Sequence, residues 1–266
     1  MYARPMLGAA LILALAFCGI SAIRPSDALA ETAVQSKPFA PAFADKDLSE
    51  MVSTLEAAFA TSPGTSRLLS NAKTSLWNFT RKIQSGSMNA KQEETVLRHI
   101  DQLGRQYPEA ATAVGQSRRI VTHFTVGKAA PEIIGNDLEG KPMRLSEYRG
   151  RVVVLSFSGH WCGICRSAYP HERTLIERYG ASGFSFLGVN SDADPKLAQQ
   201  AYLDNGLTFR SWWDGPRGGA IASAWEITGW PTTYVLDAQG IIRFVDLRQD
   251  DLLNSVADLL SEPGTR

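Results

Sequence analysis

The chain has 266 residues, of which 44% are hydrophobic and 20% are charged, and its formal net charge is zero. This composition is that of an ordinary globular protein with enough apolar material for a core, and the length exceeds what one small domain needs. Because there is no basic excess, the composition gives no support to a nucleic-acid-binding function.

The N-terminal segment has the pattern of an export signal. Residues 1–30 contain Arg4, an apolar run from Met6 to Ile23, and Ala28-Leu29-Ala30 as a cleavage site. Cleavage would remove Cys18 and leave a mature chain with two cysteines, which suits an oxidising compartment. We therefore expect the protein in the periplasm or cell envelope. An uncleaved segment anchored in the inner membrane is the alternative.

A linker is predicted over residues 31–44, which contain two prolines and little periodicity. Helical periodicity then runs through residues 45–125 and predicts a small helical region. Asp47 and Glu50 fit a capping box at the start of its first helix. The predicted helices run from about Asp47 to the break at Pro63-Gly64, then to Ser85-Gly86, from Asn89 to Tyr107, and from Glu109 to Val121.

The periodicity changes after Gly127, and residues 127–266 read as a second domain. Strands separated by helices and ending in a hairpin predict an α/β fold with a mixed central sheet covered on both faces. The expected strands are 152–157, 184–190 and the hairpin 232–237 with 241–246, and the expected helices are 195–205, 219–225 and 252–260.

A Cys-x-x-Cys motif follows the first of these strands, in Trp161-Cys162-Gly163-Ile164-Cys165. This order predicts a dithiol at an exposed helix N-terminus. Unpaired backbone N–H groups and the helix dipole stabilise a thiolate there, so the thiol pKa falls from roughly 8.5 toward neutrality. Cys162 is the candidate nucleophile. Cys165, one turn further on, is the candidate resolving thiol.

Two other uses of a Cys-x-x-Cys pair remain alternatives. A structural zinc site needs four ligands, and Cys18 is the only other cysteine of the chain. A purely structural disulfide would close a very short loop, which removes little entropy from the unfolded chain. We therefore expect no metal, and no cofactor beyond a redox-active disulfide.

A second motif, Gly229-Trp230-Pro231-Thr232, lies far from the first in the chain. Together the two motifs resemble the thioredoxin-like superfamily, specifically exported thiol-disulfide oxidoreductases of the TlpA/ResA and AhpC/TSA-like redoxin type. The resemblance spans residues 127–260 and implies a thioredoxin-like fold. It also implies a cis-proline at Pro231 and substrate binding by Trp161, Trp230, Pro231 and Thr232; a trans turn at Pro231 is the alternative.

The sequence departs from the family at two positions. Thioredoxins have a buried aspartate where this chain has Ser156, and TlpA/ResA proteins often have a glutamate where this chain has Ala168. His171 and Glu172 are the nearest ionisable replacements for proton transfer, unless they form a solvated helix face. His160, beside the nucleophile, is expected to tune the Cys162 thiolate.

The expected function is an exported oxidoreductase that exchanges disulfides with protein substrates, as a reductant supplied by a membrane or envelope electron donor. A peroxidase of the peroxiredoxin kind is an alternative, but its signature has Thr or Ser where this chain has Gly159. A non-catalytic interaction protein with a thioredoxin fold is the other alternative.

Overall fold

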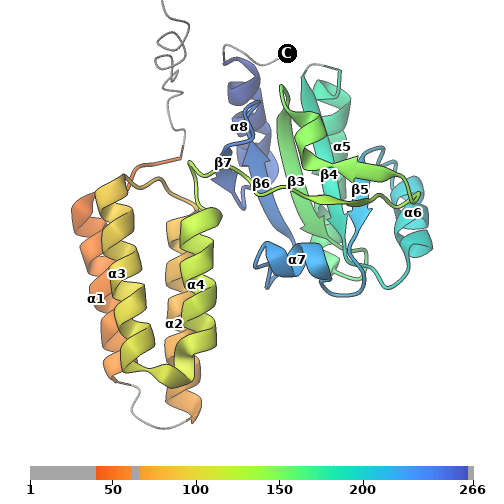
Figure 1. The fold of residues 1–266 in the computed structure, drawn as a ribbon. Helices are drawn as coiled ribbons and strands as arrows, with labels where there is room; N and C mark the ends of the chain where they lie inside the picture. Colours follow the sequence, from red (N-terminus) through yellow and green to blue (C-terminus); the bar gives the residue numbers. More distant parts are fainter. Residues whose placement is uncertain (1–39, 62–65, 182, 263–266) are drawn as a thin grey trace, which may run out of the picture. The chain divides into compact units, whose positions relative to one another are not determined.

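Four helices open the part of the chain that the computed structural model describes, which comprises residues 40–61, 66–181 and 183–262. The predicted signal, residues 1–30, and most of the predicted linker lie outside these residues. Ala42, at the end of that linker, forms an isolated bridge with Ser87. The helices are α1 (Asp45–Ala60), α2 (Ser66–Gln84), α3 (Ala90–Gln106) and α4 (Ala111–His123), the last preceded by the 3-10 turn η1 (Pro108–Ala110) (Figure 1).

The ends of these helices were predicted with mixed success. The capping box at Asp47 and Glu50 is wrong, because α1 begins at Asp45 and its N-cap, Ala44, has no side chain that could accept a hydrogen bond. The predicted start at Asn89 is confirmed. Its side chain accepts a hydrogen bond from the backbone of Gln92, whose own side chain accepts one from the backbone of Asn89. Two orphan N–H groups are thereby satisfied.

A five-stranded mixed sheet forms the centre of the second domain. It contains β3 (Val152–Ser158), β4 (Phe184–Asn190), β5 (Arg210–Trp213), β6 (Thr232–Leu236) and β7 (Ile242–Val245), in the order β5-β4-β3-β6-β7. The pairs β3–β4 and β4–β5 are parallel, whereas β3–β6 and β6–β7 are antiparallel. This sheet, with helices on both faces, confirms the predicted thioredoxin-like fold class.

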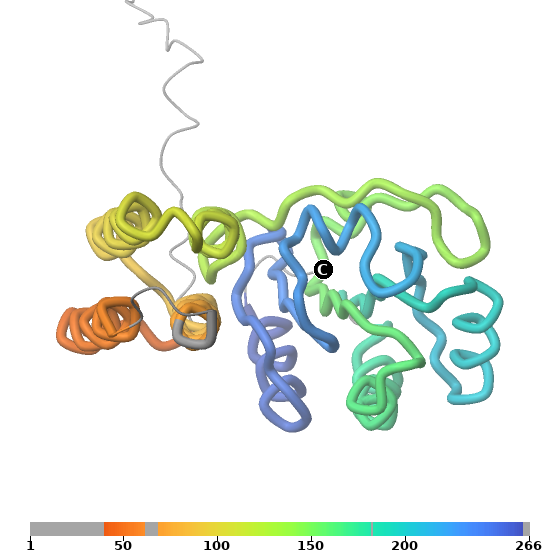
Figure 2. Tube along the Cα trace, turned by 90° about the horizontal axis from the view of Figure 1, so that it is seen from below, coloured from red at the N-terminus to blue at the C-terminus, as the bar shows by residue number. Residues whose placement is uncertain are grey.

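The two faces of the sheet carry separate apolar clusters. Alternate side chains of β3 point to opposite faces, so Val153, Leu155 and Phe157 belong to one cluster and Val152 and Val154 to the other. Figure 2 shows α5 (Gly163–Tyr179) and α8 (Gln249–Leu260) on one side of the sheet, and residues 127–150 on the other side. These last residues include the hairpin of β1 (Ile134–Asn136) and β2 (Pro142–Arg144) and the 3-10 helix η2 (Leu145–Tyr148). The remaining helices are α6 (Pro195–Asp204) and α7 (Ala220–Ala224).

Both β3 and β4 are buried along their whole length. Central strands covered on both faces read as nearly continuous apolar runs, which is why the sequence predicted them well. The edge strand β5 is not among the strands expected from the sequence. There the two neighbouring tryptophans separate, with Trp212 fully buried and Trp213 40% exposed, because successive side chains of a strand point to opposite faces.

The helical bundle and the sheet belong to one compact unit, residues 37–266. Polar contacts join α2 to β6 and to the loop before it. Gln84 Nε2 donates to the hydroxyl of Tyr234 at 2.8 Å, and Trp77 Nε1 donates to the hydroxyl of Thr228 at 3.2 Å. The loop that contains the second motif is therefore supported from the bundle.

Gly188 tests how tightly the sheet packs. It lies in β4 opposite Ser211, and a Cβ added there would come within 2.5 Å of the Ser211 Oγ. We expect Gly188→Ala to lower the free energy of unfolding by about 1–3 kcal/mol through overpacking. The control is Gly115→Ala in α4, where the nearest atom of another residue is 3.5 Å away and alanine should add about 0.5–1 kcal/mol. Urea unfolding followed by circular dichroism measures both, and an equal or higher stability of Gly188→Ala would contradict the packing.

Candidate active site

The two cysteines of the first motif lie at the start of α5, as predicted. Cys162 is the N-cap residue of this helix, and its Sγ accepts a hydrogen bond from the backbone N–H of Cys165 at 3.3 Å. A sulfur atom thus takes the place of the oxygen that usually caps a helix. No disulfide joins the two cysteines in this structure, and both are buried.

The prediction of an openly exposed nucleophile needs correction. Cys162 is 8% exposed and Cys165 is 1% exposed. Neighbouring groups shield the Cys162 thiol from solvent. The thiol donates a hydrogen bond to the carbonyl of Trp230 at 3.6 Å, and the rings of Trp161 and Trp230 pack edge to face with their centroids 5.7 Å apart. Cys162 therefore keeps a small exposed area at which a substrate sulfur can approach, whereas Cys165 is enclosed. This difference suits a nucleophile with a resolving thiol behind it.

Asp192 anchors the turn that leads into the dithiol. Its buried carboxylate accepts hydrogen bonds from the backbone N–H groups of His160 at 3.0 Å and Trp161 at 3.2 Å, and from the side chain of Asn190 at 2.8 Å. The turn after β3 is in this way tied to the end of β4. Sequence reasoning missed Asp192; the signal was the polar run Asn190-Ser191-Asp192 directly after an apolar strand.

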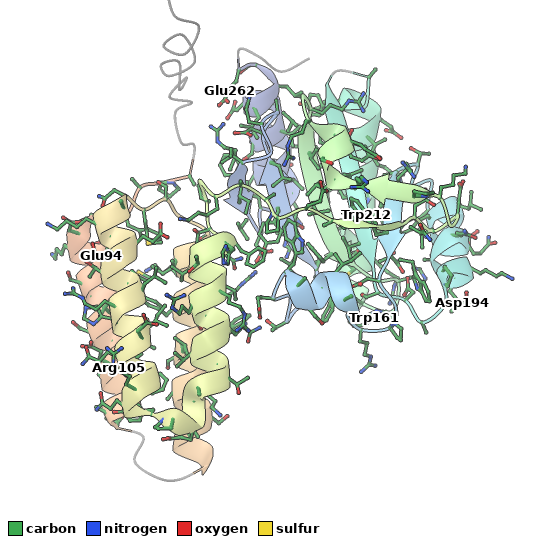
Figure 3. All side chains as sticks on the ribbon, in the orientation of Figure 1. Glu94, Arg105, Trp161, Asp194, Trp212 and Glu262 are labelled. Carbon is green, nitrogen blue, oxygen red and sulfur yellow. The ribbon has the colours of Figure 1, made fainter. Side chains whose placement is uncertain are left out.

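Exposed apolar side chains next to Cys162 form a rim around the motif. Trp161 is 43% exposed, its indole N–H donates to the carbonyl of Ser191 at 3.0 Å, and the guanidinium of Arg217 lies over its ring at 5.6 Å. Ile164, in the first turn of α5, is 68% exposed. Figure 3 shows Trp161 at the same end of the sheet as α7. An exposed apolar rim beside a thiol is a surface on which a peptide chain can pack.

The second motif lies against the first. The Trp230–Pro231 peptide bond is cis, and Thr232 begins β6, where its hydroxyl donates to the carbonyl of Gly229 at 2.9 Å. On the other side of this loop, Arg248 donates to the carbonyl of Pro231 at 2.7 Å. Sequence reasoning missed Arg248, because nothing in the sequence near it indicates a partner in this loop.

Glu172 lies on the buried face of α5 that also contains Cys165. The two residues are seven apart, which places them two turns apart on one side of the helix. Burial raises the pKa of the Glu172 carboxyl to about 8, against an opposing effect of the positive charge of Arg248. Burial also raises the pKa of Cys165 to about 12, and its hydrogen bond with Cys162 and the charge of Glu172 act in the same direction. A solvated position for Glu172 is therefore excluded.

The two histidines near the motif occupy different environments. Nδ1 of His160 lies 3.3 Å from the hydroxyl of Tyr169, whose ring stacks on the imidazole, and the carbonyl of His160 accepts a hydrogen bond from Arg166 at 2.6 Å. His171 precedes Glu172 on α5 and is half-buried. One residue turns an α-helix by about 100°, so His171 faces away from the line of Cys165 and Glu172. Glu172 therefore lies on the same side of α5 as Cys165, where its charge acts on that thiol, whereas His171 lies on another side of the helix.

Two further features concern the described residues as a whole. Within residues 40–61, 66–181 and 183–262, no group of three or more His, Cys, Asp or Glu side chains is arranged to hold a metal ion. None of the helices in the described part of the chain is both long enough and apolar enough to span a bilayer.

Comparison with known proteins places these features in a family. Residues 126–245 match the AhpC/TSA family. The thiol-disulfide oxidoreductase ResA of Geobacillus thermodenitrificans is 35% identical over 123 residues, which cover 46% of this chain and 69% of that protein. The chain belongs to the ResA-type thiol-disulfide oxidoreductases. The resemblance proposed from the two motifs, and with it the enzyme class, is confirmed.

Other ResA-type relatives and several solved structures are also similar. ResA of Bacillus anthracis is 29% identical over 115 residues, which cover 43% of this chain and 65% of that protein. A secreted thiol-disulfide isomerase from Corynebacterium glutamicum is 31% identical, with a TM-score of 0.45 over 50% of this chain and 85% of that one. The thioredoxin domain of a Bacteroides vulgatus thiol-disulfide oxidoreductase is 25% identical, with a TM-score of 0.47 over 52% and 99% of the two chains.

Glu172 makes the stability of this ResA-type protein depend on pH. Its pKa rises from 4.5 to about 8 on folding, so folding favours the protonated carboxyl. The stability that this proton contributes is fully present below about pH 4.5 and is lost as the pH rises to about 8. At about 1.4 kcal/mol per pKa unit, the loss is on the order of a few kcal/mol.

We therefore expect Glu172→Gln to remove most of this decline. Urea unfolding of the reduced protein between about pH 4.5 and 8 measures it. Glu177→Gln, at an exposed position of the same helix, is the matched control and should keep the wild-type pH dependence. A wild-type stability that does not change across this range would contradict the burial of an ionisable Glu172.

Proposed function

We propose that the protein is an exported thiol-disulfide oxidoreductase that reduces disulfide bonds of protein substrates with the Cys162–Cys165 dithiol. The observation that carries the proposal is the position of the Cys162 sulfur, at the N-cap of α5 and 3.6 Å from the carbonyl of Trp230. A substrate disulfide that reaches Cys162 of the first motif would bring its neighbouring backbone close to Trp230 of the second motif. The export signal predicted in residues 1–30 supports a location in the periplasm or cell envelope.

The reaction transfers two electrons from the dithiol to the substrate disulfide. The Cys162 thiolate attacks one sulfur of the substrate, a mixed disulfide forms, and the other substrate sulfur leaves as a thiolate that takes a proton from water. Cys165 then passes its proton to the Glu172 carboxylate and attacks the Cys162 sulfur. This step closes the Cys162–Cys165 disulfide and releases the second substrate thiolate, which is protonated in turn.

Glu172 is our candidate for the proton acceptor in the second step. Ser156 and Ala168 occupy the positions where related proteins often have an acid, and neither can take a proton. A pKa of about 8 leaves both forms of Glu172 accessible near neutral pH, so the carboxyl can accept a proton from Cys165 and later return it. His160, beside Tyr169, is a candidate for tuning the Cys162 thiolate.

The rim residues suit an extended peptide as the substrate. The adjoining rings of Trp161 and Trp230 offer apolar surface beside Cys162, and Pro231 and Thr232 belong to the loop whose Trp230 carbonyl binds the Cys162 thiol. Reduction of the resulting Cys162–Cys165 disulfide requires a thiol donor, for which we propose a membrane or envelope protein.

A peroxidase is a weaker candidate because of Gly159. A Cβ at this position would come within 2.4 Å of the indole nitrogen of Trp161. The hydroxyl side chain that a peroxiredoxin has here would therefore require Trp161 to move, along with its hydrogen bond to Ser191.

Insulin reduction with dithiothreitol as the donor tests the activity. We expect turnover by the wild type and loss of turnover in Cys162→Ser, because the remaining thiol, Cys165, is enclosed and cannot attack a substrate. Pre-reduced Cys165→Ser, mixed with insulin after removal of dithiothreitol, should accumulate a mixed disulfide that is visible on a non-reducing gel. Consumption of hydrogen peroxide in place of insulin would support the peroxidase, and silence in both assays would support a binding protein.

The role of Glu172 is tested by single-turnover kinetics. In Glu172→Gln we expect formation of the mixed disulfide at the wild-type rate and its resolution by Cys165 slowed about 10-fold to 100-fold at pH 7, the range typical of a lost general base. Glu177→Gln should resolve at the wild-type rate. Equal resolution rates in Glu172→Gln and the wild type would remove Glu172 from the mechanism.

A further inference from the structure

Arg248 connects the helical bundle with the loop of the second motif. Its guanidinium donates to the carbonyl of Pro231 at 2.7 Å and to the hydroxyl of Thr233 at 3.3 Å, and lies 3.6 Å from the carboxylate of Asp246. Asp246 forms an ion pair with Arg81 of α2. Arg81 of the bundle, Asp246 after β7 and Arg248 thus form a series of charged groups that ends at the carbonyl of Pro231.

The same guanidinium lies close to the dithiol, because it binds the carbonyl of Pro231, and the carbonyl of the preceding residue, Trp230, accepts the hydrogen bond of the Cys162 thiol. Burial lowers the pKa of Arg248, and negative charge on Cys165, Glu172 and Cys162 opposes this effect. For Glu172 the interaction is mutual, since Arg248 is the charge that lowers the pKa of this carboxyl against the larger effect of burial. A cation close to these three groups favours their ionised forms.

Other charged groups around the dithiol already have partners. The Asp192 carboxylate binds the backbone N–H groups of His160 and Trp161, Arg166 donates to the carbonyl of His160, and Arg217 lies over the Trp161 ring. The two basic residues among them, Arg166 and Arg217, thus contact His160 and Trp161 of the turn. Among the described residues, Arg248 is the arginine that donates a hydrogen bond to the carbonyl of Pro231, in the loop with the cis Trp230–Pro231 bond.

We propose that Arg248 is a positioning residue that stabilises negative charge on the dithiol, and that the helical bundle holds it in place through Arg81 and Asp246. The inference rests on the proposed thiol-disulfide exchange at Cys162 and Cys165, and it gives the helical region a task in that chemistry. Without Arg248, the thiolate loses its counter-charge. The reduced form then becomes less stable relative to the uncharged disulfide, and the couple becomes more reducing.

Two readouts that need no protein substrate test this inference. One is the pH dependence of iodoacetamide alkylation of the reduced protein, and the other is the equilibrium of the dithiol with glutathione. In Arg248→Gln we expect alkylation at pH 7 to slow about tenfold and the equilibrium constant to shift about tenfold toward the disulfide, equivalent to about 30 mV. Arg248→Lys keeps the charge and should recover most of both effects.

Variants in the bundle test the connection through Asp246. Arg81→Gln should shift both readouts in the same direction as Arg248→Gln, by about threefold, because Asp246 is then free to draw Arg248 away from the loop. Arg119→Gln is the matched control, since Arg119 joins the bundle to Glu226 of the sheet domain without contacting Arg248. Arg118→Gln, which breaks an ion pair with Asp101 inside the bundle, is the second control. Both controls should behave as the wild type.

The outcomes separate the inference from the function on which it rests. A wild-type dithiol that does not equilibrate with glutathione would contradict both. Normal exchange in the wild type with unchanged readouts in Arg248→Gln would overturn the inference alone. Equal shifts in Arg81→Gln and Arg119→Gln would overturn the connection through Asp246, and equal losses in Arg248→Lys and Arg248→Gln would overturn the role of charge.

Discussion

The active site depends on one buried carboxylate. Asp192, just beyond β4, accepts hydrogen bonds from two successive backbone N–H groups of the turn that follows β3. This tie sets the direction in which the chain enters α5, and so places a sulfur at the helix cap. A buried carboxylate without these donors would be costly, so the turn and the aspartate stabilise each other. The neighbouring parallel strands β3 and β4 supply the rigid base on which both rest.

Patterns of neighbouring residues in the sequence predicted the strands and helix starts that such residues determine. The strand at residues 184–190 has the predicted bounds, and the Cys-x-x-Cys pair begins a helix because a buried strand and a short turn precede it. The contacts of Asp192 and Arg248 were beyond such reasoning, since their partners lie 31 residues and 17 residues away. The capping box at Asp47 failed for another reason: the chain before α1 pairs with Ser87, and this tertiary contact sets where the helix starts.

In the mechanism that we propose, Glu172 replaces a family acid from a different position on the helix. Position 168, where related proteins often have an acid, holds an alanine, and the carboxyl appears four residues later. Four residues are about one turn of an α-helix, so positions 168 and 172 lie on the same side of α5. The chain continues as a helix through Pro170, which lies between the two positions. A carboxyl so far from solvent keeps its proton more readily than an exposed one, which is the property a proton carrier behind an enclosed thiol requires.

The unequal exposure of the two sulfurs has a consequence for damage by oxidants. Only Cys162 can be reached from solvent, so a chance encounter with an oxidant forms a sulfenic acid at that residue first. The Cys165 thiol is already beside it and can condense with the sulfenic acid, expelling water and closing the disulfide. That product belongs to the normal cycle, whereas further oxidation to the sulfinic or sulfonic acid would be irreversible. The Cys165 thiol can therefore reverse the first oxidation of Cys162, while its own burial protects it from the oxidant.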